Sequence, residues 1–282
     1  MAGTAVTPIT VTPIAGAIGA EIAGVDLSQE LPDETVAEIR QALLDHLVVF
    51  FRGQELTPRQ IMAFARRFGE PVAYPFVKGL DEFPEITPIL KRESDRSNFG
   101  GLWHSDTVYQ QVPPMGTLLY GIEIPPYGGD TEFANQYLAY ETLSAPLRGF
   151  LDGLKAVNVS GKGAVQKTRD EMMKQAPAGL KGDELSACHP AVRSHPETGR
   201  KALYVNTAHT LRFDGMSEEE SAPILDFLFR HQVKAEFTCR FRWQKGSLAF
   251  WDNRCTQHNP INDYHGFRRL MHRVTLAGDV PV

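Results

Sequence analysis

The chain has 282 residues, of which 42% are hydrophobic and 22% are charged, a composition typical of globular proteins. Its net charge of −5 gives no reason to expect nucleic acid or an anionic membrane as a partner. No run of about 18 apolar residues predicts a membrane span, and the first residues lack the pattern of a signal peptide. The three cysteines share no CxxC spacing, so we expect a reduced, cytoplasmic protein.

The first third of the chain predicts two helices and a buried strand. Apolar residues recur at helical spacing over 32–46, and the uninterrupted apolar run LVVFF at 47–51 is typical of a buried strand. The stretch TPRQ at 57–60 has the pattern of a helix-capping box with proline at the first helical position. Gly69 is expected to end the helix that follows.

After residue 100, short β-rich runs predominate, and turn signals such as PPYGGD separate several of them. Because these runs do not alternate with helices, we predict a mainly β fold with flanking helices, a sandwich or barrel rather than a parallel sheet. The predicted strands cover residues 117–124, 202–206, 237–243, 247–251 and 269–277.

Two other segments interrupt this pattern. A helix is predicted over 218–231, and Pro223 is expected to bend it or to delay its start. Residues 159–186 are polar and weakly periodic, which predicts a lid or a mobile insertion. No repeat and no low-complexity linker divides the chain, so we expect a single domain over 1–282.

The stretch GLWHSDTVY at 101–109 contains two good metal ligands, His104 and Asp106, two positions apart. In a strand their side chains would point to the same face and could chelate a divalent cation. The alternative is a buried histidine hydrogen-bonded to its neighbouring aspartate, because an HxD pair is common by chance.

A third candidate ligand, His258, lies far downstream in SLAFWDNRCTQHNP. With His104 and Asp106 it completes a set of two imidazoles and one carboxylate. That set binds one face of an octahedral Fe(II) in non-haem oxygenases and leaves the opposite face open. Zinc would accept the same ligands with a water, so the residue types alone leave the metal open.

The strand predicted over 269–277 places Arg269, Met271, Arg273 and Thr275 on one face. One interpretation sends both arginines to solvent. The other keeps them buried, because an oxoacid that chelates iron through its 1-carboxylate and 2-keto oxygen has a distal carboxylate to anchor. A guanidinium makes bidentate bonds and stays charged when buried. At about 3.3 Å per residue the two arginines would lie about 13 Å apart, so one wall could hold two anions.

At these motifs the chain resembles the taurine/2,4-dichlorophenoxyacetate dioxygenase family, whose members depend on Fe(II) and 2-oxoglutarate. The resemblance covers nearly the whole chain and implies a double-stranded β-helix, or jelly-roll, fold. It implies hydroxylation of a small acid by O2, coupled to the decarboxylation of 2-oxoglutarate to succinate and CO2. The motifs that carry it are HSD at 104–106, GGDT at 128–131, WDNRCTQH at 251–258 and RRLMHR at 268–273.

The resemblance also implies roles for individual residues. It assigns the three candidate ligands His104, Asp106 and His258 to iron. It assigns Thr131 and Arg269 to the distal carboxylate of 2-oxoglutarate. Arg273 matches the arginine that holds the acidic group of the substrate in the taurine enzyme.

The substrate pocket departs from the taurine enzyme. A histidine and an asparagine help to hold the sulfonate there, and Tyr74 and Gly100 occupy those places here. An aromatic residue that encloses taurine corresponds to His209. We therefore expect Tyr74 and His209 to shape a wider pocket for an alkyl sulfate, a bulkier sulfonate or an aryloxyalkanoate. A taurine dioxygenase proper is the alternative.

Two other classes of protein fit part of the pattern. A zinc-dependent hydrolase could use the same three ligands to activate water, but it gives no use to Thr131 and Arg269. A non-catalytic binding protein would not need an intact set of ligands. Metal analysis with succinate detection separates the three classes. The resemblance also implies a homo-oligomer, a dimer or a tetramer.

Overall fold

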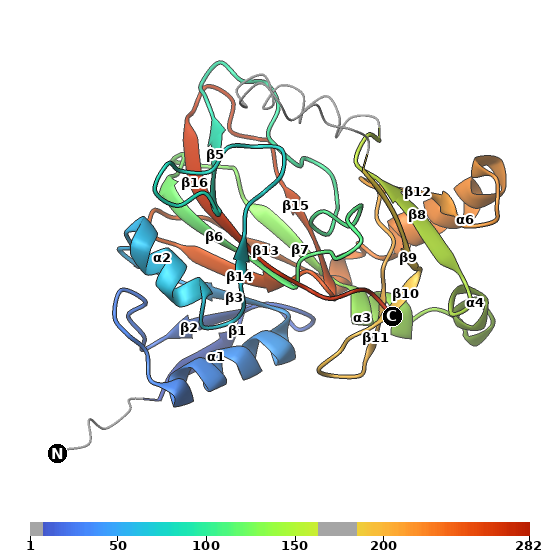
Figure 1. Ribbon diagram of the computed structural model, residues 1–282, viewed down its shortest axis with the longest axis horizontal. Coiled ribbons are helices and arrows are strands. Elements are labelled where there is room, and N and C mark those ends of the chain that lie inside the picture. Colours follow the sequence, from blue (N-terminus) through green and yellow to red (C-terminus); the bar gives the residue numbers. More distant parts are fainter. Residues whose placement is uncertain (1–7, 163–184) are drawn as a thin grey trace.

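The structure is a computed structural model that describes residues 8–162 and 185–282 (Figure 1). Most of the lid or insertion predicted at 159–186 lies outside the described residues. Strand β8 (Lys155–Val159) leads into that segment, and β9 (Ser186–Pro190) follows it. Among the described helices, none combines the length and the apolar character that crossing a membrane requires.

The architecture is a jelly roll in which a large sheet faces a small one (Figure 1). The large sheet runs in the order β1-β2-β3-β14-β6-β16-β4, with β5 also paired to β16, and the small sheet runs β13-β7-β15. The predicted fold class, mainly β with flanking helices, is confirmed. The large sheet comprises β1 (Thr10–Pro13), β2 (Ala20–Ala23), β3 (Val48–Phe51), β4 (Pro71–Val72), β5 (Ile86–Lys91), β6 (Gly116–Glu123), β14 (Leu248–Asp252) and β16 (Arg269–Leu276). The small sheet comprises β7 (Thr131–Asn135), β13 (Thr238–Phe241) and β15 (Thr256–Pro260).

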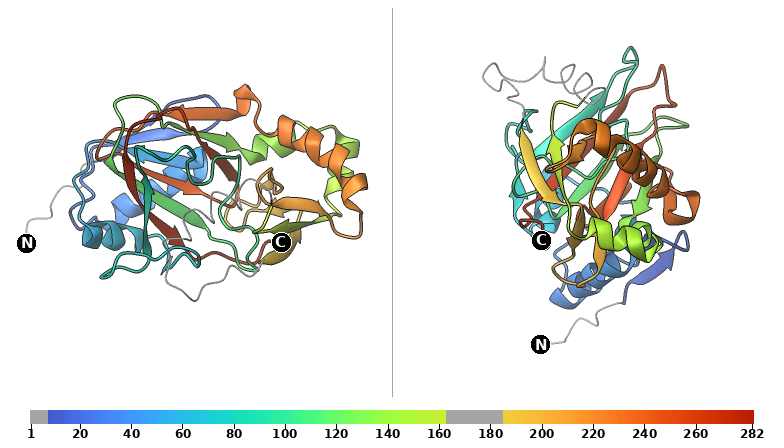
Figure 2. Two further views of the ribbon diagram at one scale, coloured as in Figure 1. Left: turned by 90° about the horizontal axis from the view of Figure 1, so that it is seen from above. Right: turned by 90° about the vertical axis from the view of Figure 1, so that its right-hand side faces the viewer.

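The large sheet is covered on both faces, which explains why β3 reads as an uninterrupted apolar run. Alternate residues of β3 enter different layers: Val49 and Phe51 pack under helices, whereas Val48 and Phe50 pack between the sheets. Phe50 stacks on Phe241 of the small sheet, with ring centroids 4.0 Å apart. The covering helices, which lie together in Figure 2, are α1 (Asp33–His46) and α2 (Pro58–Ala65).

A third group of elements packs around its own apolar cluster at the end of the molecule opposite to α1 and α2 (Figure 1). It includes α4 and α6 and the sheet β12-β8-β9. The remaining elements of this part are α3 (Gln136–Glu141), α4 (Ala145–Leu151), β10 (Val192–Ser194), β11 (Lys201–Leu203), β12 (Thr210–Phe213), α6 (Glu218–His231) and the 3₁₀ turn η1 (Ala235–Phe237).

Capping boxes determine where two helices begin. At α2 the Thr57 hydroxyl accepts from the Gln60 amide, and the Gln60 side chain accepts from the Thr57 amide, as predicted. Ser217 and Glu220 make the same pair of bonds at α6. Helix α6 therefore begins directly after Ser217 and continues through Pro223. The expectation that this proline delays the start was wrong, because the cap lies ahead of it.

The predicted ends of one helix and one strand were also wrong. Helix α2 ends at Ala65, because the amides of Arg67 and Phe68 bond three residues back and close the helix in tight turns before Gly69. The strand predicted over 202–206 ends at Leu203. Beyond it, the Asn206 amide donates to the Thr210 hydroxyl at 2.9 Å and starts a turn.

Candidate metal centre and adjoining pockets

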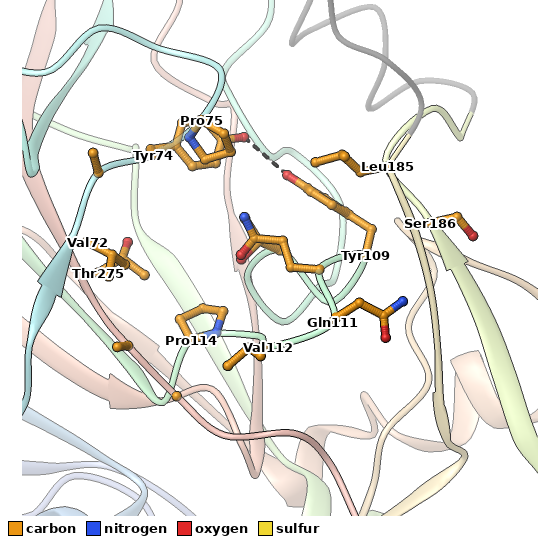
Figure 3. Close-up of a pocket in the computed structure, with 15 residues that line it drawn as sticks. Val72, Tyr74, Pro75, Tyr109, Gln111, Val112, Pro114, Leu185, Ser186 and Thr275 are labelled. Atoms are coloured by element: carbon orange, nitrogen blue, oxygen red, sulfur yellow. Dashed lines mark hydrogen bonds between the residues drawn. The ribbon is translucent and has the colours of Figure 1, made fainter.

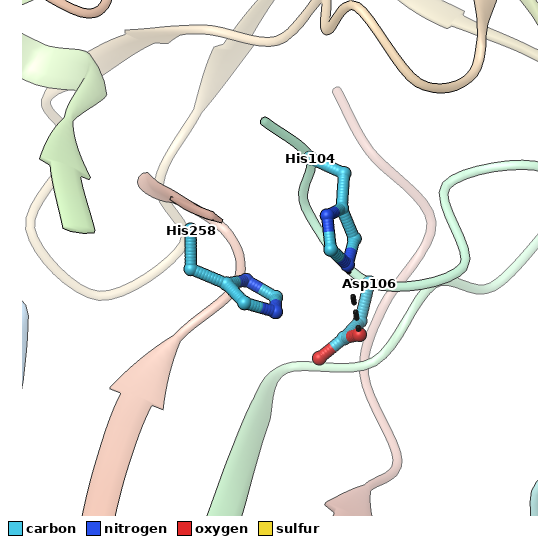
Figure 4. A group of neighbouring side chains, drawn as sticks. All are labelled: His104, Asp106 and His258. Carbon is cyan, nitrogen blue, oxygen red and sulfur yellow. Dashed lines mark ion pairs between the residues drawn. The ribbon is translucent and has the colours of Figure 1, made fainter. Parts of the chain in front are cut away.

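Three buried side chains, those of His104, Asp106 and His258, converge on one another, as Figure 4 shows. His104 Nε2 lies 3.9 Å from Asp106 Oδ1, and the rings of His104 and His258 have centroids 4.2 Å apart. One ligand atom from each of the three residues lies within 4.8 Å of the others. The structure thus brings together the three candidate ligands, with His258 from β15 and the other two from the segment before β6.

The segment that carries His104 and Asp106 is not a strand, so strand alternation is not the reason that they meet. His104 forms an isolated bridge with His258, in which each backbone amide donates to the other residue's carbonyl, at 3.1 and 2.8 Å. The residues after the bridge turn, and Thr107 has a left-handed φ of 46°. This turn brings the Asp106 carboxylate back toward the histidines.

Hydrogen bonds leave one free ligand atom on His104 and one on Asp106, and the buried Nδ1 of His258 has no hydrogen-bond partner among the described residues. His104 Nδ1 lies 2.6 Å from the Leu102 carbonyl, so Nδ1–H donates and Nε2 keeps its lone pair. The Thr117 hydroxyl donates to Asp106 Oδ2 at 2.7 Å, which leaves Oδ1 on the side of the histidines. A ring nitrogen of His258 points toward the other two residues in Figure 4.

A second layer of hydrogen bonds orients the Asp106 carboxylate. The Asn253 side chain donates to the Thr117 hydroxyl at 2.8 Å and accepts from the Trp251 indole at 2.9 Å. It also accepts from the Asp106 amide at 3.3 Å. Our sequence reasoning missed Thr117 and Asn253. Asn253 stood inside the WDNR motif and could have been found there, whereas Thr117 had no local signal.

Burial and neighbouring charges set the protonation of the three ligands. Burial lowers the pKa of His104, and burial together with His104 lowers the pKa of His258 to about 3. Burial alone would raise the pKa of Asp106, but the two histidines, Arg273 and the Thr117 hydroxyl outweigh it and lower this pKa to about 2. At neutral pH the centre therefore holds two neutral imidazoles and one carboxylate, ready to bind a divalent cation.

Both arginines of β16 point inward, so the interpretation that sends them to solvent was wrong. Arg269 and Arg273 are only 5% and 7% exposed. Nε and Nη2 of Arg269 have no hydrogen-bond partner among the described residues. The Arg269 guanidinium lies 5.7 Å from the centre of the Trp243 ring, and Trp243 Nε1 donates to the Thr131 hydroxyl at 2.9 Å. Thr131 and Arg269 therefore lie against the same indole.

Arg273 lies beside two aromatic rings and close to the candidate ligands. Its guanidinium is 4.4 Å from the centre of the Tyr74 ring and 5.7 Å from that of Phe99, and Nη1 is 3.5 Å from Asp106 Oδ1. A small cavity of about 30 Å³ is lined by residues that include Tyr74, Phe99, Arg273, Asp106 and His209. The side chains considered for the substrate pocket thus surround one space, and Phe99 is an addition that the sequence reasoning missed.

Gly100 contributes backbone and no side chain to this cavity. Its φ of 74° is left-handed, and a Cβ there would lie 3.0 Å from Cε1 of His104. A side chain at this position would therefore press on the ring of a candidate ligand.

A larger cavity of about 550 Å³ adjoins the small one (Figure 3). The two share Tyr74, Thr107 and Tyr109, and the hydroxyls of the two tyrosines lie 3.4 Å apart where the cavities meet. Apolar side chains such as Val112 and Leu185 make up much of its wall, and no charged side chain lines it in the described part of the chain. This space suits an apolar group attached to whatever occupies the small cavity.

A second group of ligand-type residues, His195, Asp252 and Cys255, is already satisfied by protein contacts. The Asp252 carboxylate accepts from Arg254 at 2.6 and 2.9 Å and from His195 Nε2 at 3.0 Å. His195 Nδ1 accepts from two backbone amides, each at 3.2 Å. Because no lone pair remains aimed at a common point, this group is a structural ion-pair network.

Comparison with known proteins agrees with the fold and with the resemblance seen in the sequence. The family described as "Taurine catabolism dioxygenase TauD, TfdA family" matches residues 10–275. The chain is 37% identical to an alkylsulfatase from Acinetobacter baylyi (95% of this chain and 84% of that protein). It is also 37% identical to an alpha-ketoglutarate-dependent sulfate ester dioxygenase from Pseudomonas putida (97% and 91%). The crystal structure of a taurine dioxygenase from Burkholderia xenovorans superimposes with a TM-score of 0.83 at 42% identity (98% and 91%). The chain therefore belongs to the TauD, TfdA family and is an alpha-ketoglutarate-dependent dioxygenase.

Proposed function

We propose that this enzyme uses Fe(II), 2-oxoglutarate and O2 to hydroxylate an alkyl sulfate or a related small acid with an apolar tail. The observation that carries the proposal is the buried Arg273, which lies beside the candidate ligands and lines a small cavity that adjoins a larger, mainly apolar one. Two relatives, named as an alkylsulfatase and a sulfate ester dioxygenase, support the same substrate class.

His104, Asp106 and His258 would hold the iron. Their free ligand atoms lie within 4.8 Å of one another, and two imidazoles with one carboxylate are the facial donor set of non-haem Fe(II) oxygenases. When bound, the iron supplies oxidative decarboxylation of 2-oxoglutarate to succinate and CO2, coupled to hydroxylation of a substrate C–H bond. Thr117 and Asn253 would keep the aspartate in one orientation.

Arg269 and Thr131 would bind the distal carboxylate of 2-oxoglutarate. Arg269 is buried with two nitrogens unpartnered among the described residues, and a carboxylate would satisfy them with bidentate bonds. Thr131 accepts from Trp243, so its own hydroxyl hydrogen can be donated to the same carboxylate.

Arg273, which lies beside the rings of Tyr74 and Phe99, would bind the acidic group of the substrate. His209 would close the far side, and the apolar tail would extend past the tyrosine pair into the larger cavity. For an alkyl sulfate, hydroxylation of the carbon next to the ester oxygen gives a product that breaks its C–O bond. The fragments are an aldehyde and hydrogen sulfate, so no further reactant is needed.

The test is a panel of compounds scored by substrate-dependent succinate release. We expect hexyl sulfate to stimulate release most, phenoxyacetate less, taurine poorly, and the neutral hexanol not at all. Arg273→Ala should weaken the binding of the preferred acid far more than the binding of 2-oxoglutarate. If taurine leads the panel, or if hexanol does as well as the acids, the substrate proposal is wrong. Hydrolysis by zinc-loaded protein without succinate would favour the hydrolase instead.

A further inference from the structure

A buried lysine accompanies Arg269 on the inner face of the large sheet. Strand β5 pairs with β16, and in that register Lys91 lies directly opposite Arg269. Residues opposite each other in an antiparallel pair point to the same face, with side chains close enough to share a ligand. Lys91 is 4% exposed and Arg269 is 5% exposed, so both cationic groups are withdrawn from water.

Neither cation is neutralised by a hydrogen-bonded carboxylate within the described structure. Lys91 Nζ has no hydrogen-bond partner there, and Arg269 leaves Nε and Nη2 free. Both cations lie near the Tyr264 ring, whose centre is 4.4 Å from Lys91 Nζ and 5.8 Å from the Arg269 guanidinium. Asp130 is close enough to act on Arg269 through its charge but is not hydrogen-bonded to it: Oδ2 accepts from Arg240 at 2.7 Å, and the buried Oδ1 has no hydrogen-bond partner among the described residues.

Two buried cations without a bonded anion are costly, because each ammonium or guanidinium has lost its water. Tyr264 and Trp243 offer ring faces, which compensate only in part. An anion with two oxygens would remove the deficit, since one oxygen could accept from each cation. The site thus has the charge and the donors for a carboxylate.

We propose that Lys91 is a second cationic residue for the distal carboxylate of 2-oxoglutarate, which it binds together with Arg269. This inference rests on the proposed co-substrate site at Arg269 and Thr131, and it adds a residue from a strand that the sequence motifs do not include. With two cations, the site should select a dicarboxylic oxoacid strongly over a monocarboxylic one.

The experiment measures dissociation constants without turnover, by anaerobic calorimetry on the Mn(II)-loaded protein. The ligands are 2-oxoglutarate and 2-oxopentanoate, which has a methyl group in place of the distal carboxylate. Lys91→Met should raise the dissociation constant of 2-oxoglutarate roughly ten- to hundred-fold, the range for one lost hydrogen bond between charged groups. Binding of 2-oxopentanoate should be unchanged or tighter. Lys91→Arg should recover most of the 2-oxoglutarate affinity.

Controls separate this inference from the function on which it rests. Lys245→Met removes an exposed positive charge and should change neither constant. Arg269→Ala should also weaken 2-oxoglutarate selectively. If it does so while Lys91→Met does not, only the inference fails, and if neither variant does, the proposed co-substrate site fails as well.

A purely structural lysine gives a different pattern. Lys91→Met would then weaken the binding of both ligands equally, or of neither, and the inference would be overturned. If the Met variant does not fold, Lys91→Gln takes its place with the same expectation. A chain that folds with neither replacement would also overturn the inference, because the fold itself would then require the lysine.

Discussion

Asp106 joins the candidate metal centre to the hydrogen-bond layer behind it, because one carboxylate oxygen is held by Thr117 and the other faces the histidines. We expect Asp106→Ala to lose bound iron and substrate-dependent succinate release while it keeps its fold. The measurements are iron content after reconstitution, succinate and thermal unfolding, with the exposed Asp45→Ala as control. Full activity with iron retained in the Asp106 variant would contradict the assignment of this ligand.

Thr117 is expected to act through Asp106 and not on the metal directly. Thr117→Val keeps the shape of the side chain but removes the hydroxyl that bonds both Asp106 and Asn253. We expect a metal dissociation constant raised about 10-fold or more, as is usual for residues that orient a ligand. Calorimetric titration with Mn(II) measures this, and Thr142→Val, at an exposed helix end, is the control. Unchanged metal affinity would show that Asp106 is oriented without this bond.

At the scale of elements, the capping box stabilises the start of α6. The helix packs in the apolar cluster that also contains residues of β8 and β12, away from the candidate ligands. Ser217→Ala removes the hydroxyl that accepts from the Glu220 amide. We expect the free energy of unfolding to fall by about 1 kcal/mol, with no change in turnover at temperatures where the chain is folded. Urea unfolding measures the first quantity. Thr57→Ala is the matched change at α2, and a loss of turnover by Ser217→Ala alone would reveal a role for α6 in the site.

Elements whose cause is local could be predicted from the sequence. The box at 57–60 and the apolar run of β3 carry their own signals, and both are present. The turn at His104 could not be predicted, because Thr-Val-Tyr favours a strand locally and the bridge to His258 overrides that preference. The same limit applied to Lys91, whose burial depends on its register with Arg269, far along the chain. The roles of Thr131, Arg269 and Arg273, which were assigned through the family motifs, stay predictions until tested.

At the scale of the whole molecule, buried carboxylates make the free energy of unfolding depend on pH. Asp106 and Asp252 are both buried, which alone would raise the pKa of each. At each carboxyl, neighbouring groups lower the pKa more than burial raises it. The histidines and Arg273 do so at Asp106, and Arg254 is the largest such influence at Asp252, so both pKa values lie below the usual range. A carboxyl with a lower pKa in the folded state stabilises that state above its unfolded pKa, and this contribution is lost as the pH falls.

We therefore expect the free energy of unfolding of the metal-free protein to fall already below about pH 6.5, because His104 and His258 stay neutral in the folded state while the unfolded chain takes up their protons. It should fall further between about pH 4 and pH 2, by about 2 kcal/mol for each of the two buried carboxyls. Urea unfolding at several pH values measures this, and Asp252→Asn should flatten the slope. A stability that rises on acidification would contradict the sign. The expected single domain and homo-oligomer stay predictions at this scale.

The contact between Arg273 and Asp106, at 3.5 Å, makes the proposed substrate and the metal thermodynamically linked. A guanidinium so close to a ligand oxygen repels an incoming cation, and an acidic substrate bound to Arg273 would screen that repulsion. Metal affinity should then rise when the substrate acid is present. By reciprocity, substrate affinity should rise by the same factor when the metal is present. The coupling should disappear in Arg273→Met. In the unmodified enzyme, the fraction of protein that holds iron would then depend on the concentration of the substrate acid as well as on that of iron.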